Sequence, residues 1–240
     1  MKIKLKKYFK KNKLKKFQFN DEQINQIHKG LKKKLDVSWY AKPEFNWEQM
    51  RQIRLGLERG LNVKWYTNTK LNIDQMHQII SGLEEKLDVS WYAKPELNSG
   101  QMKEIYKGLK KRLDVSWYID PKFNEEQMEE IRWGLQEKLD VSWYAKLDFN
   151  WQQMRQIRLG LERGLDVSWY AKPDFNFAEM ELICEGLKKK LDVSWYASSE
   201  YDWEQMAEIC EGLKQGLDVS KFANSDFSAD QMRQIKEYFL

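Results

Sequence analysis

Histidine, cysteine and proline are scarce in this chain. Its 240 residues include two histidines, two cysteines and four prolines. A glycine-rich phosphate loop, an HExxH zinc motif and a nucleophile elbow are also missing, although each would be recognisable from a short run of residues. Their absence predicts that the protein is not an enzyme and that it has no catalytic residue and no cofactor.

The two cysteines, Cys184 and Cys210, fit neither a metal site nor a disulfide. They occupy the same place in successive copies of a repeat, and no third or fourth zinc ligand accompanies them. Packed helices lie about 8–10 Å apart, whereas a disulfide requires Cα atoms within about 7 Å. We therefore expect no bound metal and two free thiols, which are typical of a cytoplasmic protein.

Long apolar runs are missing as well. No segment approaches the roughly 20 apolar residues that cross a bilayer as a helix. The N-terminal segment is basic, but no apolar stretch with a cleavage site follows it. We therefore expect neither a secretory signal nor a membrane span.

The dominant positive feature is a repeat. The block LDVSWY, or a variant of it, returns every 26 residues without an insertion or a deletion. A fixed period of this kind is typical of arrays in which each unit packs on its neighbours. The leucines that open the blocks are Leu35, Leu61, Leu87, Leu113, Leu139, Leu165, Leu191 and Leu217.

Each repeat contains two helix starts. Asp36 is suited to cap a short helix, which Pro43 would stop. Asn46 and Gln49 form the capping-box pattern of a longer helix of about 13 residues. This second cap keeps its chemical class along the chain, as Asn20, Asn46, Asn72, Asn98, Asn124, Asn150, Asn176, Asp202 and Ser228.

The longer helix has an apolar stripe and an interior glycine. Met50, Ile53 and Leu57 recur at helical spacing. Gly56 falls inside the helix, where glycine costs about 1 kcal/mol relative to alanine, so its recurrence predicts a close helix–helix approach. No segment alternates with period two. The predicted fold is therefore all-α, an α-solenoid of two-helix (short plus long) 26-residue repeats that spans residues 17–240 as a single domain.

Residues 1–16 form a basic N-terminal cap or tail. They contain nine lysines and no acid. This segment is either a solubilising cap or an arm for nucleic acid or another anionic surface. Its lysines are Lys2, Lys4, Lys6, Lys7, Lys10, Lys11, Lys13, Lys15 and Lys16.

A tryptophan recurs in the short helix, and two interpretations of it stay open. The rings either pack between consecutive short helices or form an exposed aromatic edge. Exposed rings about 8–10 Å apart would be too far apart to stack on every base of a nucleic acid, but they match one turn of a polyproline helix, about 9.3 Å. The series is Trp39, Trp65, Trp91, Trp117, Trp143, Trp169 and Trp195.

On one surface of the longer helices the residues differ from repeat to repeat, as recognition of a non-repetitive partner would require. Alternatively, these positions vary only because they face solvent and any polar residue is tolerated there. Exposed apolar residues on this surface would form the sticky patches that mark interfaces. The predicted partner-binding residues are Leu55, Trp133, Leu159, Arg54 and Arg158.

The pattern LDVS-x-YA-x-P-x-F-(N/D)-x-x-QM-x-x-I-x-x-GL resembles short helical repeats in uncharacterised proteins of Firmicutes and their mobile elements. The resemblance covers roughly residues 17–240. It implies a repeat architecture and a mobile-element setting. This chain departs from that pattern by placing tryptophan where the repeats of that family are variable.

These observations predict a non-enzymatic, cytoplasmic binding protein. We expect an extended solenoid surface that recognises a protein partner, for example as an inhibitor or scaffold of a larger complex such as a host defence system. The alternative is nucleic-acid binding through the lysine tail and a Trp/Lys edge, which would include Lys42, Lys94, Lys146 and Lys172. The sequence does not determine the oligomeric state.

Overall fold

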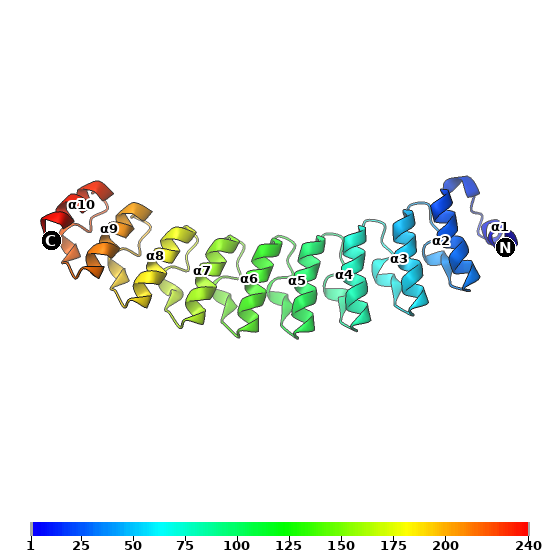
Figure 1. Cartoon of the computed structure of the whole chain (residues 1–240), viewed down its shortest axis with the longest axis horizontal. Coiled ribbons are helices and arrows are strands. Elements are labelled where there is room, and N and C mark those ends of the chain that lie inside the picture. Colours follow the sequence, from blue (N-terminus) through cyan, green and yellow to red (C-terminus); the bar gives the residue numbers. More distant parts are fainter. Residues whose placement is uncertain (1, 240) are drawn as a thin grey trace. The chain divides into compact units, whose positions relative to one another are not determined.

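The computed structural model of the chain describes residues 2–239. Within this range the regular secondary structure is entirely helical, and no strand occurs. This confirms the predicted all-α solenoid of repeats (Figure 1). The described residues form two compact units. The first runs to Val115 and includes Ile119–Pro121, and the second comprises Ser116–Tyr118 and the residues from Lys122 onward.

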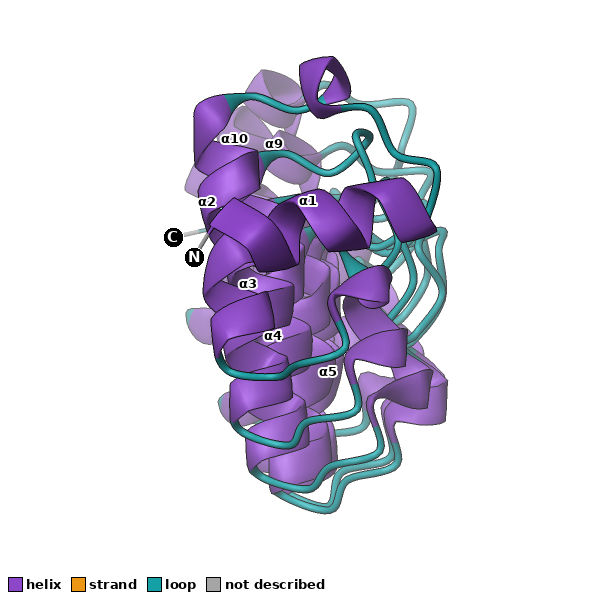
Figure 2. Cartoon of the chain, turned by 90° about the vertical axis from the view of Figure 1, so that its right-hand side faces the viewer, coloured by secondary structure: helices purple, strands orange, loops and turns teal. Residues whose placement is uncertain are grey.

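Each repeat contributes one α-helix, and within each unit successive α-helices pack side by side. The first unit holds α1 (Lys2–Lys11), α2 (Asp21–Lys32), α3 (Trp47–Glu58), α4 (Ile73–Glu84) and α5 (Ser99–Lys110). The second holds α6 (Glu125–Gln136), α7 (Trp151–Glu162), α8 (Phe177–Lys188), α9 (Trp203–Lys214) and α10 (Ala229–Tyr238). Helix α1 differs from the others because it runs across the direction of α2 instead of alongside it (Figure 2).

The short helix of each repeat is a single 3₁₀ turn. In the first copy after α2, Asp36 accepts a hydrogen bond from the backbone N–H of Ser38 at 3.1 Å, and the backbone leaves the helical region at Tyr40, where φ is −133°. The 3₁₀ helices are η1 (Lys16–Gln18), η2 (Val37–Trp39), η3 (Val63–Tyr66), η4 (Val89–Trp91), η5 (Val115–Trp117), η6 (Val141–Trp143), η7 (Val167–Trp169), η8 (Val193–Trp195) and η9 (Val219–Lys221).

The expectation that Pro43 stops the short helix is wrong. Helix η6 ends at the same place as η2, although Leu147 stands where the repeat of η2 has Pro43. The feature that η2 and η6 share at this point is the tyrosine that follows the turn. Tyr40 and Tyr144 are completely buried, so anchoring of this ring in the core turns the chain out of the helix.

All nine predicted caps of the longer helix are confirmed. In each of α2–α10 the cap side chain accepts a hydrogen bond from the backbone N–H three residues later, and the residue at that third place returns a bond to the backbone of the cap. In α7, for example, Asn150 Oδ1 accepts from the N–H of Gln153 at 3.0 Å, and Gln153 Oε1 accepts from the N–H of Asn150 at 2.8 Å.

The capping-box glutamine also joins one repeat to the next. The amide nitrogen of Gln153 donates to the carbonyls of Pro173 and Phe175, in the turn before α8, at 3.1 and 2.6 Å. The same bridge recurs at Gln23, Gln49, Gln75 and Gln205. Helix α8 is the exception, because Glu179 stands at this place and an ionised carboxylate has no hydrogen to donate.

The interior glycine is close to a tyrosine, not to a neighbouring long helix. A Cβ built on Gly82 would lie 2.0 Å from the hydroxyl oxygen of Tyr92 and 2.8 Å from Val89. Both residues belong to the segment that immediately follows α4. The hydroxyl of Tyr92 also donates to the carbonyl of Gln78 at 3.1 Å. The predicted close approach is therefore real, but its partner is the buried tyrosine that follows the 3₁₀ helix of the next repeat.

The longer helices end on a residue in the left-handed region. At the end of α4 this residue is Lys86, with φ of 59°, and Gly60 occupies the same place after α3 with φ of 73°. The N–H of Lys86 donates to Leu83 at 3.1 Å, and the N–H of Leu87 donates to Gly82 at 2.8 Å. This is the hydrogen-bond pattern of a Schellman motif, which usually has glycine at its left-handed position.

We expect Lys86→Gly to stabilise the protein. The left-handed conformation costs a residue with a Cβ about 1–2 kcal/mol, and glycine avoids this cost. Glycine also loses more conformational entropy on folding, which offsets part of the stabilisation. The net gain should be about 0.5–1 kcal/mol in urea-induced unfolding. Gly60→Lys is the reciprocal control, because no atom lies within 4 Å of a Cβ at Gly60, and it should lose a similar amount. A loss on Lys86→Gly would contradict this account.

Candidate binding surfaces

The seven tryptophans of the 3₁₀ helices are partly exposed. Their relative exposure ranges from 36% to 41%, so more than half of each side chain is covered and the rest is open to solvent. Packing between consecutive short helices and an exposed aromatic edge both stay predictions. In the first unit these residues are Trp39, Trp65 and Trp91, and in the second they are Trp117, Trp143, Trp169 and Trp195.

Two of the lysines predicted to accompany this edge lie over phenylalanine rings. The ammonium of Lys42 is 5.9 Å from the ring centroid of Phe45, and that of Lys172 is 5.8 Å from the ring of Phe175. Both lysines remain exposed. A cation over an aromatic face at this distance gains about 0.5–1 kcal/mol. These contacts hold the lysine stems against the turn before the next long helix.

The predicted residues on the long helices have different environments. Trp133 is 39% exposed, and the guanidinium of Arg132 lies 5.0 Å from the centroid of its ring. Leu55 and Leu159 are half-buried. Of the three apolar residues predicted on this surface, Trp133 therefore offers the largest open area to a partner.

A further row of large apolar side chains lies at the N-terminal ends of α7–α9. Phe177 and Trp203 are the first residues of α8 and α9, and they are 45% and 48% exposed. Trp151, the first residue of α7, is half-buried, while Leu147 in the preceding turn is 45% exposed. The repeat pattern did not predict this row. The signal was an aromatic residue directly after the helix cap, where a side chain lies outside the apolar stripe.

The described part of the basic segment folds mainly as helix α1. Phe9 is buried and Leu5 and Tyr8 are half-buried, while Lys4, Lys6, Lys7, Lys10 and Lys11 are exposed. The side chain of Lys2 lies outside the described residues. Lys13, Lys15 and Lys16, which follow α1, are also exposed. The segment thus turns its apolar side toward α2 and presents most of its charge to solvent.

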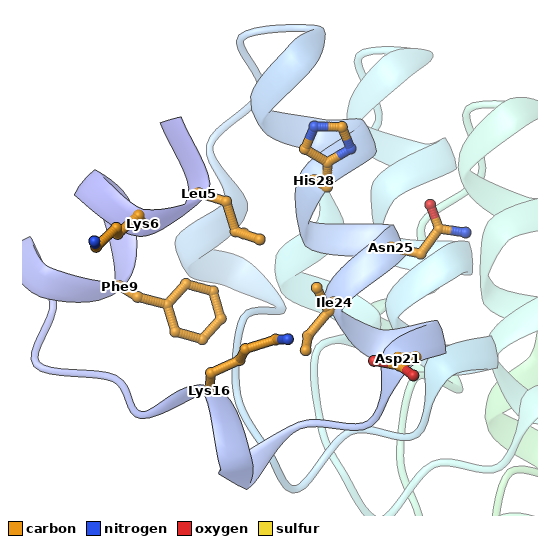
Figure 3. A pocket seen from close by; sticks show the side chains of 8 residues that line it. All are labelled: Leu5, Lys6, Phe9, Lys16, Asp21, Ile24, Asn25 and His28. Carbon is orange, nitrogen blue, oxygen red and sulfur yellow. The ribbon is translucent and has the colours of Figure 1, made fainter. Parts of the chain in front are cut away.

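A cavity of about 600 Å³ lies between α1 and α2. Leu5 and Phe9 reach into it from α1, and Ile24 reaches into it from α2 (Figure 3). The side chain of Lys16 extends toward Ile24 from the segment between the helices. Asp21, at the start of α2, also lines the cavity.

Arg54 and Arg158, predicted to bind a partner, contact neighbouring helices instead. The Nε of Arg54 donates to Gln26 of α2 at 3.0 Å, and Arg54 is 7% exposed. The Nε of Arg158 pairs with Glu130 of α6 at 2.7 Å. Each guanidinium also pairs with a glutamate one turn later in its own helix. These arginines therefore join successive repeats and leave little of the guanidinium for a partner.

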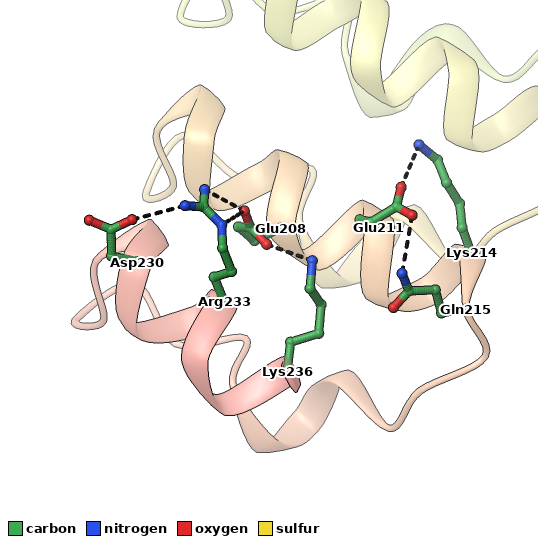
Figure 4. Close-up of polar contacts among 7 residues, drawn as sticks. All are labelled: Glu208, Glu211, Lys214, Gln215, Asp230, Arg233 and Lys236. Carbon is green, nitrogen blue, oxygen red and sulfur yellow. Dashed lines mark hydrogen bonds and ion pairs between the residues drawn. The ribbon is translucent and has the colours of Figure 1, made fainter. Parts of the chain in front are cut away.

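The equivalents of Gln26 and Arg54 in the last two repeats are Glu208 and Lys236, and they form an ion pair between α9 and α10. Glu208 accepts from Lys236 at 2.6 Å and from Arg233 at 2.8 Å (Figure 4). Burial opposes ionisation of Glu208, but the hydrogen bonds from Lys236 and Arg233 outweigh burial and hold its pKa below the ordinary value of 4.5. At the preceding junction the equivalent residues are Leu182 and Cys210, so the chemistry of this contact changes along the array.

We expect Glu208→Gln to weaken the fold at neutral pH but not in strong acid. Because the folded pKa of Glu208 is lowered, its stabilisation is fully present above about pH 4.5 and is lost as the pH falls through the folded pKa. The loss at pH 7 should be about 1–2 kcal/mol, because glutamine still accepts a hydrogen bond from Lys236 but no longer balances its buried charge. Thermal unfolding between pH 7 and pH 2 measures it. Glu200→Gln, an exposed acid before α9, is the control. A difference that persists undiminished at pH 2 would contradict this assignment.

Cys184 and Cys210 are free and buried, and each thiol lies beside a buried tyrosine, Tyr170 or Tyr196, whose pKa is raised chiefly by burial. Between residues 2 and 239 no group of three or more His, Cys, Asp or Glu side chains is arranged to hold a metal ion. No helix in the same range is long and apolar enough to cross a membrane.

Comparison with known proteins gave no relative. No protein-family model matches the chain, and no curated protein and no solved structure shows a significant match to it.

Proposed function

We propose that this chain is a non-enzymatic binding protein that recognises a protein partner through the outer surface of its solenoid. The observation that carries the proposal is the apolar row at the N-terminal ends of α7–α9. Phe177 and Trp203 are nearly half exposed, although Met180 and Met206, one turn later in the same helices, are completely buried. Large aromatic side chains of this kind dominate the binding energy of many protein interfaces.

The partner-binding surface proposed here lies in the second unit and comprises this row together with Trp133 and the half-buried Leu159. Leu55 is half-buried in the first unit and stays a separate candidate. Arg54 and Arg158 are not included, because their guanidiniums are engaged between repeats. The resemblance of the 26-residue pattern to repeats of Firmicutes mobile elements supports a narrower proposal, an inhibitor or scaffold of a larger complex such as a host defence system. The two free thiols support a cytoplasmic location.

The test is capture of a partner from an extract of the source cells, treated with nuclease, on the immobilised full chain. The expected result is a protein whose retention is lost with Phe177→Glu/Trp203→Glu and with Trp133→Glu. Trp195→Glu is the matched control, because Trp195 is 39% exposed in the same unit but lies in a 3₁₀ helix. Retention that survives the first two changes and is lost with the control would overturn the choice of surface.

A second candidate function is nucleic-acid binding, favoured by the lysines of α1. Lys4, Lys7 and Lys11 are exposed, and no ion pair involves them in the described part of the chain. Binding driven by phosphate contacts weakens steeply with salt. Fluorescence anisotropy with a labelled single-stranded DNA should therefore show binding that falls with added salt and disappears with Lys4→Glu/Lys7→Glu/Lys11→Glu. Binding that is insensitive to these three changes would exclude the segment as the interface.

A further inference from the structure

The cavity between α1 and α2 exists because the array has no ordinary repeat before α2. The residues of α2 that line it, Ile24 and His28 among them, occupy the places that face the preceding repeat elsewhere. Arg54 shows this orientation directly, because it is the equivalent of His28 and bonds to α2. The equivalents of Ile24, such as Met50, are completely buried, whereas Ile24 is only half-buried. Helix α1 therefore covers this apolar face incompletely.

The walls of the cavity are mainly apolar, with a small number of charged groups. Leu5, Phe9 and Ile24 provide the apolar surface, and the side chain of Lys16 extends toward Ile24 (Figure 3). A volume of about 600 Å³ falls within the range of small-molecule sites, which are typically apolar with a few placed polar groups. The site is thus shaped for a compact ligand with an apolar body.

The charges around the cavity specify the sign of the ligand. Lys6 and Lys16 line it, and among the described side chains neither of them forms an ion pair. Asp21 is the acid in the lining. Further exposed lysines follow on α1 and after it, so the local field is positive. An anionic head group near Lys16 would gain a charge-assisted hydrogen bond that the free protein lacks.

We propose that this cavity binds a small amphipathic anion, a carboxylate with an aliphatic body of medium length. The carboxylate lies against the ammonium of Lys16, and Lys6 adds positive charge at the edge of the cavity. The aliphatic body lies against Leu5, Phe9 and Ile24. This site is separate from the surface on α7–α9, and the proposal does not depend on the function proposed for that surface.

Isothermal titration of the full chain with decanoate tests the proposal. Decanoate should bind at least about tenfold more tightly than acetate, which lacks the apolar body, and than decyltrimethylammonium, which reverses the charge. Lys16→Glu should weaken decanoate binding by at least about tenfold, and Asp21→Asn should strengthen it. Lys64→Glu, at an exposed lysine in η3, should leave binding unchanged.

Circular dichroism shows whether each variant keeps its helices, and Leu5→Gln provides a second test of the site from the apolar wall. Loss of decanoate affinity in folded Leu5→Gln supports the proposal. Equal affinity for the cationic amphiphile, or decanoate binding that is insensitive to both Lys16→Glu and Leu5→Gln, would overturn it. Binding to phosphatidylglycerol vesicles without any binding of free decanoate would also overturn it, since a membrane surface would then be the ligand.

Discussion

Gly82→Ala should destabilise the protein by about 2 kcal/mol, although alanine is the better helix former. Helix propensity favours alanine by about 1 kcal/mol, whereas forcing an extra carbon into a filled core costs about 1–3 kcal/mol and occasionally more. The new Cβ would lie 2.0 Å from the hydroxyl oxygen of Tyr92. The ring of Tyr92 is completely buried and cannot move aside, so the steric term should exceed the propensity term.

A double-mutant cycle with Tyr92→Phe isolates this contact. Removing the hydroxyl leaves the ring carbon Cζ, at 3.2 Å, as the nearest atom of residue 92. Gly82→Ala should therefore cost less in the Tyr92→Phe background than in the natural one. Ser81→Ala, at a half-buried place in the same helix, controls for helix propensity and should be neutral or stabilising. Urea unfolding of the four proteins gives the coupling energy, and a value near zero would contradict the steric explanation.

Gln153→Glu should weaken the second unit by about 2–3 kcal/mol at pH 7. The substitution keeps the shape of the side chain and its acceptor for Asn150, but removes both hydrogen bonds to the carbonyls of Pro173 and Phe175. The site is 5% exposed, so the new carboxylate would face these carbonyls with little water to solvate it. Thermal unfolding of Gln153→Glu and of the natural chain measures the difference.

The exception in α8 supplies the reverse experiment. Glu179→Gln should gain about 1 kcal/mol, since it restores the donor that the other repeats use toward the following turn. Glu181→Gln, at an exposed place two residues later in the same helix, is the matched control and should have little effect. If Glu179→Gln left the unfolding free energy unchanged, the bridge between repeats would not be a source of stability.

The repeat pattern predicted most of the fold because its signals are local. Caps such as Asn46 depend on hydrogen bonds within three residues, and the stripe of Met50 and Ile53 depends only on helical spacing. The 3₁₀ geometry of the short helix was not predictable in this way, because it is set by where Tyr40 packs. The role of Gln153 between repeats also involves a distant turn. The sequence did contain an indication of this role, because glutamine, which can donate a hydrogen bond, and not glutamate occupies this place in eight of nine repeats.

The binding surfaces were predicted less well, for a related physical reason. A sequence position that varies between repeats can face solvent or can face the adjacent repeat. Arg54 and Trp133 looked alike by this criterion, yet Arg54 is 7% exposed and Trp133 is 39% exposed. Phe177 and Trp203 were missed because they precede the apolar stripe. Only the packing of one helix against the next separates these cases.

The glutamate at the start of α8 also bears on how the second unit opens. Each repeat in an array is stabilised mainly by contacts with its nearest neighbours. The junction with the fewest hydrogen bonds between repeats should therefore separate two blocks of helices, each of which unfolds cooperatively. Amide hydrogens in α9 and α10 should therefore exchange with deuterium together, and sooner than those of α6 and α7. A single acid at residue 179 would in this way set the boundary between two blocks of helices that unfold independently of each other.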